Sequence, residues 1–398
     1  MSMSLNQEFT PLKLLRFAAP SIIMMMFMSL YTIIDGMFVS RFVGSNALSA
    51  TNIVYPVVNI MIAIATMLAT GGNAIISKYL GEGKKKEAKE RLTMFVVITL
   101  IVSVVIMLIT LIFLDQICYL LGSTDELLPY CRNYLMILAF FAPACMLQSL
   151  FQCYLVTAER PTLGLVLIIL AGVLNAVLDY VMIVHCHLGI SGAALATGLG
   201  QAFNLVFYLI IYKMQPIQVK LSRRHLHPDM ALAARLYSVG IPGALNLALP
   251  SVLVSALNGL LAAYSQSYVV ILGIYYKLQT FLYLPASGIV QGMRPVIGYN
   301  YGAGEHKRVK KIYFVTLGMS GVIMLIGTII CLTIPGQLIG MFTTNPQTIA
   351  AGKTALRIIC AGFLISSVSV TACGALEGLG RGTASLIVSL CRYLIIIL

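Results

Sequence analysis

Two carboxylic acids stand inside long apolar segments of the chain, where acids are rare. Asp35 lies within the run LYTIIDGMFV, and Asp179 lies within AGVLNAVLDYVMIV. An ionised side chain at bilayer depth is costly, so it usually faces a protein interior or a water-filled path. The two acids therefore indicate a route or a binding site for an ion or a substrate.

The residues around these acids suit the capture of a small cation. Asn175 precedes Asp179 by four residues, so the two side chains share one helix face. Carboxylate, amide and hydroxyl oxygens are hard ligands suited to Na⁺. Alternatively, two carboxylates close together at low dielectric cannot both stay ionised, so one of them carries a proton. We predict a cation site, for Na⁺ or H⁺, made by Asp35, Asn175, Asp179 and Thr197. The alternative is that both acids are merely satisfied buried polar groups.

The segments that carry these residues are long enough to cross a membrane. The chain is 59% hydrophobic and 10% charged, with a mean hydropathy of +0.94, which excludes an ordinary soluble domain. Because lipid offers the backbone no hydrogen bonds, spans of about 20 apolar residues must be helices. Spans are predicted at 14–39, 48–77, 92–114, 130–156, 162–184, 191–212, 231–262, 268–299, 312–334 and 350–376, and an eleventh begins at 383.

The basic residues indicate how these spans are oriented. They gather in the N-terminal segment and in alternate loops such as 78–91 and 307–311, whereas the loop at 40–47 holds only Arg41. This positive-inside pattern predicts a multi-pass protein of the cytoplasmic (inner) membrane with a cytoplasmic N-terminus. It also accounts for the net charge of +13 without a nucleic-acid partner. In this orientation the four cation-site residues all fall in the outer half of the membrane.

The chain repeats itself with an offset of 221 residues. The sequence from Gly81 to Lys84 matches that from Gly302 to Glu305, and each is followed by a basic run. Six spans per repeat is an even number, so the two halves enter the membrane from the same side. The predicted fold is an all-α polytopic membrane protein of two six-helix bundles, related by a pseudo-twofold axis along the membrane normal. Twelve spans are expected, of which the last is missing from this chain.

This repeat predicts two lobes around a central cavity that opens alternately to each side. The predicted organisation is an N-lobe at 1–212, a cytoplasmic linker at 213–230 and a C-lobe at 231–398. Met-rich surfaces adapt to varied apolar ligands. The residues predicted to line the substrate cavity are Met28, Tyr31, Asn52, Tyr55, Gln148, Gln152 and Lys277.

The second lobe differs in its charges. Asn258 stands where the repeat places Asp35, and the spans there carry the cations Lys277 and Arg392 instead. These cations either bind an anionic group of a substrate or are buried structural charges. The inequality of the lobes predicts a single ion site, in the first lobe.

Two loop regions and the polar set resemble a known family. The run YKLQTFLYLPASGIVQGMRPVIGYNYGAGEHKRVKK at 276–311 is similar to the signature of the eighth span in MATE (multidrug and toxic compound extrusion) transporters. ATGGNAIISKYLGEGKKKEAKERL resembles the matching loop of the first half. Asp35, Asn175, Asp179 and Thr197 match the family's amino-lobe cation site residue by residue. The pattern is most similar to the DinF- and MepA-like branch.

The resemblance implies a cation-coupled antiporter that exports drugs or amphipathic organic compounds against Na⁺ or H⁺ entry. It implies a small-molecule substrate, a coupling cation and no cofactor beyond the ion; we also expect a lipid bilayer around the protein and a monomer. A lipid or oligosaccharide flippase of the same superfamily is the nearest alternative, but it calls for a cavity rich in Arg and Lys. An intramembrane aspartyl enzyme calls for YD and GxGD motifs, which the chain lacks, so we expect no enzyme.

Overall fold

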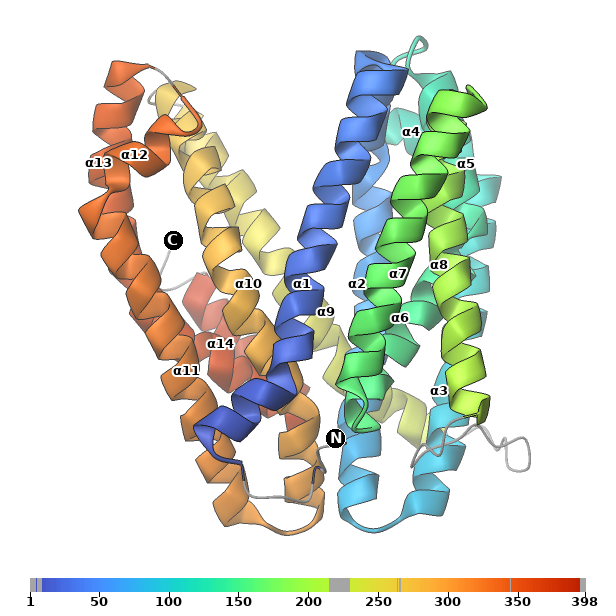
Figure 1. Ribbon diagram of the computed structural model, residues 1–398, viewed down its shortest axis with the longest axis vertical. Coiled ribbons are helices and arrows are strands. Elements are labelled where there is room, and N and C mark those ends of the chain that lie inside the picture. Colours follow the sequence, from blue (N-terminus) through green and yellow to red (C-terminus); the bar gives the residue numbers. More distant parts are fainter. Residues whose placement is uncertain are drawn as a thin grey trace.

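The computed structural model describes residues 5, 9–214, 230–262, 264, 266–343 and 345–393, and the regular structure in these ranges is helical (Figure 1). The first half contains α1 (Pro11–Phe38), the π-helical turn η1 (Val39–Val43), α2 (Ser45–Gly81), α3 (Lys85–Ile112), α4 (Leu114–Leu120), α5 (Leu128–Phe140), α6 (Ala142–Thr157), α7 (Pro161–Asp179), the π-helical turn η2 (Tyr180–His185) and α8 (Gly189–Met214). The second half contains α9 (Met230–Ala262), α10 (Gln266–Gly302), α11 (His306–Thr333), α12 (Pro335–Gly340), α13 (Pro346–Cys360), α14 (Gly362–Gly378) and α15 (Gly382–Leu390).

Each of the predicted spans has a helix in the structure, which confirms the all-α polytopic fold class. Seven described helices are long and apolar enough to cross a membrane, and the number rises to nine if each of two bent helix pairs is one span. The first pair, α5 and α6, bends by 51°, and the second, α13 and α14, bends by 46°. Pro143 lies in the first turn of α6, where its missing N–H leaves no helical hydrogen bond unmade.

The two halves touch at one end of the molecule and diverge toward the other (Figure 1). The basic loops that follow α2 and α10 lie at the touching end, which we call the inner end. Two hydrophobic clusters here join the halves: one packs Leu236 of α9 among residues of α2, α3 and α6, and the other packs Phe17 of α1 among residues of α10 and α11. Near the outer end, each half has a cluster of its own.

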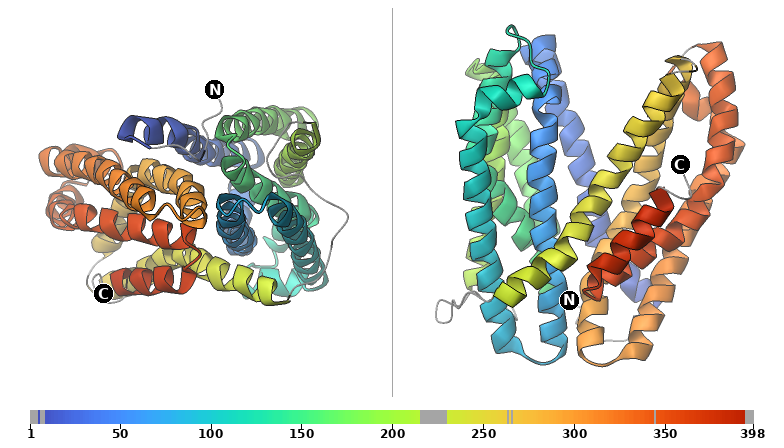
Figure 2. Two further views of the ribbon diagram at one scale, coloured as in Figure 1. Left: turned by 90° about the horizontal axis from the view of Figure 1, so that it is seen from below. Right: turned by 180° about the vertical axis from the view of Figure 1, so that it is seen from behind.

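The joint between the halves is made by two helices that cross from one half to the other (Figure 2). Helix α1 packs along α10, and α9 packs along α2. Small residues let these backbones approach: a Cβ at Gly71 would meet the Leu236 carbonyl oxygen at 2.5 Å, and one at Gly292 would meet the Ala18 Cβ at 3.0 Å. Gly71 and Gly292 are equivalent in the repeat, so the two crossings are pseudo-symmetric.

The lobe boundaries given above stay a prediction. Most of the predicted linker, residues 213–230, lies outside the described ranges. The side chain of Asn258 also lies outside the described part of the chain.

Candidate functional site: a buried acid pair in the first half

The two acids are held at the outer ends of two neighbouring helices. Asp35 lies in the last turn of α1, and Asp179 is the last residue of α7, which packs along α1. A π-helical turn follows each helix, at η1 after α1 and at η2 after α7. Such turns interrupt the regular α-helical hydrogen bonding and are frequent at functional sites. The two acids thus come from helices with the same type of ending.

Asn175 links Asp179 to the next helix. In the amide orientation that satisfies both neighbours, its nitrogen donates to Asp179 Oδ2 at 3.0 Å and its oxygen accepts from the backbone N–H of Thr197 in α8 at 3.1 Å. Asn175 is 2% exposed and Asp179 is fully buried. The spacing of four residues therefore places Asn175 beside Asp179 on one face of α7, as predicted from the sequence. Through its bond to Thr197, Asn175 also connects α8 to this acid.

The side chains of Asp35 and Asp179 lie next to one another, with Tyr31 and Thr197 beside them. Three buried oxygens of this cluster have no protein partner: Asp35 Oδ1, Asp179 Oδ1 and Thr197 Oγ1. Partnerless buried oxygens from two carboxyls and a hydroxyl fit a hard cation such as Na⁺, or a shared proton. The structure thus brings together all four residues of the predicted cation site, and it adds Tyr31, which was predicted to line the cavity. Their role in cation binding stays a prediction.

The other residues predicted to line a cavity are spread over both halves. Met28 is 47% exposed and Tyr55 is 51% exposed, and Asn52 is exposed as well. Gln152 is half-buried, while Gln148 Oε1 accepts a hydrogen bond from Asn204 Nδ2 at 3.1 Å within the first half. The role of these residues in substrate binding stays a prediction.

Lys277 lies in the outer part of α10, near the short helix α12. Its ammonium nitrogen lies 5.9 Å from the centre of the Phe342 ring, which follows the short helix α12. A lysine stem commonly packs on apolar surface while its charged head reaches toward water. The side chain is exposed and directed to this edge of the second half.

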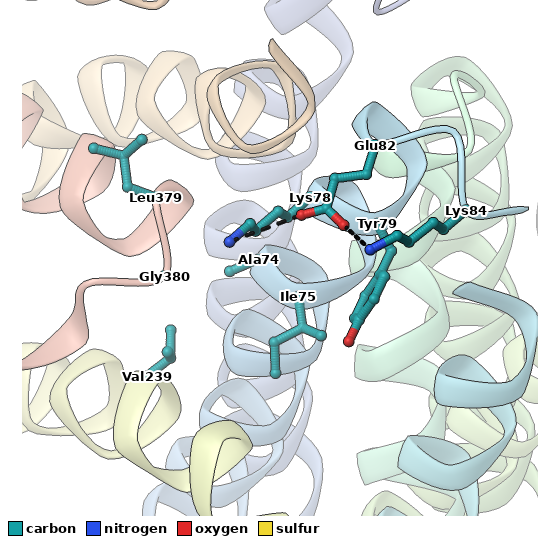
Figure 3. A pocket seen from close by; sticks show the side chains of 9 residues that line it. All are labelled: Ala74, Ile75, Lys78, Tyr79, Glu82, Lys84, Val239, Leu379 and Gly380. Atoms are coloured by element: carbon teal, nitrogen blue, oxygen red, sulfur yellow. Dashed lines mark ion pairs between the residues drawn. The ribbon is translucent and has the colours of Figure 1, made fainter. Parts of the chain in front are cut away.

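A cavity of about 220 Å³ lies at the inner end (Figure 3). Both halves contribute to its lining: Ala74, Ile75, Lys78, Tyr79, Glu82 and Lys84 from the first, and Val239, Leu379 and Gly380 from the second. Glu82 pairs with Lys84 at 2.9 Å and with Lys78 at 3.9 Å, and the hydrogen bond to Glu82 raises the pKa of Lys84. None of the predicted cation-site or cavity residues lines this space.

The sequence reasoning missed a buried charged cluster in the second half. Glu377 of α14 is 1% exposed, and Arg294 Nη2 of α10 lies 2.5 Å from its Oε2. Glu377 Oε1 accepts from Asn246 Nδ2 of α9 at 2.8 Å and from Ser385 Oγ of α15 at 3.2 Å. One carboxylate therefore joins four helices. Its only signal in the sequence was an acid near an inner helix end.

A fold of two pseudo-symmetric helical halves, with a buried acid pair in one of them, defines a polytopic membrane protein of the transporter type. The MatE family model matches residues 20–181 and 242–398, which is most of the chain. The chain belongs to the MatE family. This confirms the family resemblance predicted from the sequence.

Relatives and solved structures agree with this assignment. Multidrug export protein MepA of Staphylococcus saprophyticus is 25% identical over 384 residues, which cover 96% of this chain and 85% of that relative. The protein of the same name from Staphylococcus aureus has the same identity and coverage. A crystal structure of a MATE protein in the straight conformation superposes with a TM-score of 0.90 at 23% identity, covering 98% of this chain and 87% of that one. The outward-facing conformation of a multidrug resistance MATE family transporter gives a TM-score of 0.89 at 23% identity, with the same coverage.

Proposed function

We propose that the protein exports small amphipathic organic compounds and that the entry of Na⁺ or H⁺ drives the export. The observation that carries this proposal is the buried cluster of Asp35, Asn175, Asp179 and Thr197 in the first half. Supporting it are membership of the MatE family and the similarity to proteins named multidrug export protein MepA. The proposed setting is a monomer in the cytoplasmic membrane, with the inner end and the N-terminus in the cytoplasm.

A bound cation changes the charge of this cluster, and we propose that this change of charge couples cation entry to substrate export. Two neighbouring carboxyls at low dielectric cannot both stay ionised, so in this proposal Asp35 and Asp179 hold one proton between them, and Na⁺ would take its place at the three partnerless oxygens. A ligand can shift an equilibrium between two conformations only by its differential affinity for them. We infer that the cluster binds its cation more tightly in one conformation than in the other.

The substrate is proposed to bind between the diverging halves, within reach of exposed side chains such as Met28 and Tyr55. A flexible thioether and an aromatic ring contact varied apolar molecules without a fixed pattern of hydrogen bonds. Substrates selected in this way are amphipathic and diverse. If the cation and the substrate bind best to opposite conformations, entry of one drives exit of the other, which is antiport.

The experiment that tests this function is transport in sealed vesicles that hold the purified protein. Ethidium fluorescence is followed after a Na⁺ gradient is imposed without a pH difference, and then after a pH difference without a Na⁺ gradient. One of the two gradients is expected to drive ethidium export, and that gradient identifies the coupling ion. If neither gradient moves ethidium beyond the protein-free control, the proposal of cation-coupled export is wrong.

A further inference from the structure

The inner ends of α2 and α10 meet backbone to backbone. A Cβ at Gly81 would fall inside van der Waals distance of the Tyr299 carbonyl oxygen and would lie 2.9 Å from the Ala303 nitrogen. A Cβ at Gly302 would fall equally close to the Lys78 carbonyl oxygen. We call this contact, between residues 77–81 of α2 and 298–302 of α10, the inner seam.

The inner seam contains the same contact twice. The offset of 221 residues relates Gly81 to Gly302 and Lys78 to Tyr299, so each glycine faces the carbonyl that is equivalent to the one its counterpart faces. The pseudo-twofold axis therefore passes through the seam. At this point the two halves face each other with equivalent surfaces, as in the isologous interface of a symmetric dimer.

Close approach, and not backbone geometry, explains these two glycines. Both lie at the ends of helices without a left-handed backbone angle, whereas Gly83 and Gly304 in the following turns have φ of +76° and open space around them. Glycine is, after proline, the poorest helix former, so helix propensity does not account for it in a last helical turn. Instead, the absent side chain lets two helices pack at the distance that only small residues permit.

We propose that Gly81 and Gly302 are the positioning residues of an inner gate, and that a side chain at either position holds this gate open. The halves touch at this end and diverge at the other, so any rearrangement that opens the inner end must separate the seam (Figure 1). The cavity of about 220 Å³ borders the seam, is lined from both halves and includes Lys78 (Figure 3). The proposal rests on the proposed transport function, because a gate has a purpose only in a transporter.

The test measures the width of the seam directly. Spin labels are attached at Lys86→Cys and Lys307→Cys in an otherwise cysteine-free chain. The distance between the two labels is measured by pulsed electron paramagnetic resonance spectroscopy in lipid nanodiscs. These two positions are exposed, equivalent in the repeat and located just after the loops on either side of the seam. The same label pair is then combined with Gly81→Leu or Gly302→Leu. The matched control is Gly318→Leu, at an exposed helical glycine of α11 with nothing within 4 Å of its Cβ position.

The unsubstituted seam is expected to show a population at short distance. Gly81→Leu and Gly302→Leu should each move most of that population to longer distance, and Gly318→Leu should leave it in place. Gly81→Ala and Gly302→Ala give a smaller shift in the same direction, and they carry the test if the leucine variants do not fold. Distances that match the control in the folded seam variants would overturn the gate.

Transport measured on the same samples separates this proposal from the proposed function. A shifted distance together with loss of ethidium export supports both. A shifted distance in a protein that exports nothing in any form supports the seam as a moving joint, while it contradicts the export function. An unchanged distance with intact export overturns the gate and leaves the export function standing.

Discussion

The two halves of the molecule share a fold but use their buried acids differently. In the first half, Asp35 and Asp179 face one another near the outer end and leave oxygens without partners. In the second half, Glu377 lies near the inner end, where Arg294, Asn246 and Ser385 surround it. An acid with open coordination can exchange an ion, whereas an acid with a fixed cation and two hydrogen bonds joins helices.

Equivalent positions make the contrast sharper. The repeat places Asn73 of α2 where α10 has Arg294. Asn73 makes a neutral link instead: its amide nitrogen donates to Cys153 Sγ at 3.2 Å and its oxygen accepts from the Thr157 hydroxyl. The same place in the fold thus carries a charged tie in one half and an uncharged tie in the other. Duplicated scaffolds can divide ion handling and structural joining between their copies in this way.

The largest expected effect comes from the first half. Asp35→Asn removes one titratable partner of the pair, so gradient-driven ethidium export should fall to the rate of protein-free vesicles. The fold should persist, because a neutral amide is cheaper to bury than a carboxylate. Initial export rates and thermal melting check both statements. Asp115→Asn, which changes an acid that pairs with Arg132 at 3.4 Å outside the cluster, is the matched control and should keep the wild-type rate.

Breaking the Arg294–Glu377 ion pair of the second half should lower the free energy of unfolding. Glu377→Ala leaves the Arg294 guanidinium without its counter-charge, and because Arg294 is 28% exposed the loss in the free energy of unfolding should stay below the about 3–5 kcal/mol of a fully buried pair. Denaturant titration in mixed micelles measures the change. Arg294→Leu combined with Glu377→Ala should recover most of the loss, because the unpaired charge is then gone. A double variant that is less stable than the single one would show that the tie does not work by charge compensation.

A smaller effect is expected from the residue that orients Asp179. Asn175→Ala removes the hydrogen bond to Oδ2, and hydrogen bonds to charged groups contribute about 1.5–3 kcal/mol. The concentration of coupling ion at half-maximal export should therefore rise about tenfold or more, with a smaller change in the maximal rate. Asn204→Ala, which breaks the neutral bond to Gln148, should leave this concentration unchanged. Equal shifts of this concentration in the two variants would contradict a specific role of Asn175 in ion binding.

The smallest effect tests the uncharged tie. Thr157→Val keeps the shape of the side chain and removes its hydrogen bond to Asn73, which should lower the free energy of unfolding by about 1 kcal/mol. Comparison with Glu377→Ala in the same micelles sets the neutral tie against the charged one. If Thr157→Val lowers the free energy of unfolding as much as Glu377→Ala does, the neutral and charged ties do not differ in strength.

The helices and the acid pair were within reach of sequence reasoning because their signals are local. Apolar length identifies a span, and the spacing between Asn175 and Asp179 identifies a shared face. Depth along the spans then placed Asp35 and Thr197 at the same level. The bend at Phe141 has a local signal too, because Pro143 follows it in the first turn of α6, whereas the bend at Ala361 lies in continuous apolar sequence with only Gly362 beside it.

The charged tie was missed for a different reason. Arg294 and Glu377 are far apart in the sequence, and each stands near polar residues at the inner end of its own helix. Only packing of α10 against α14 brings them together. The glycine pairing at the inner seam was visible in the repeat as Gly81 and Gly302, but the repeat alone did not say that the two glycines face each other across the halves.

The central claim is that the ion that drives export binds to the acid pair of the first half. The most direct measurement is ethidium export by Asp179→Asn in vesicles with Na⁺ and pH gradients imposed together, beside Glu377→Gln in the same assay. The account predicts no gradient-driven export from Asp179→Asn and substantial export from Glu377→Gln. Export at the wild-type rate by Asp179→Asn, or its loss only in Glu377→Gln, would contradict it.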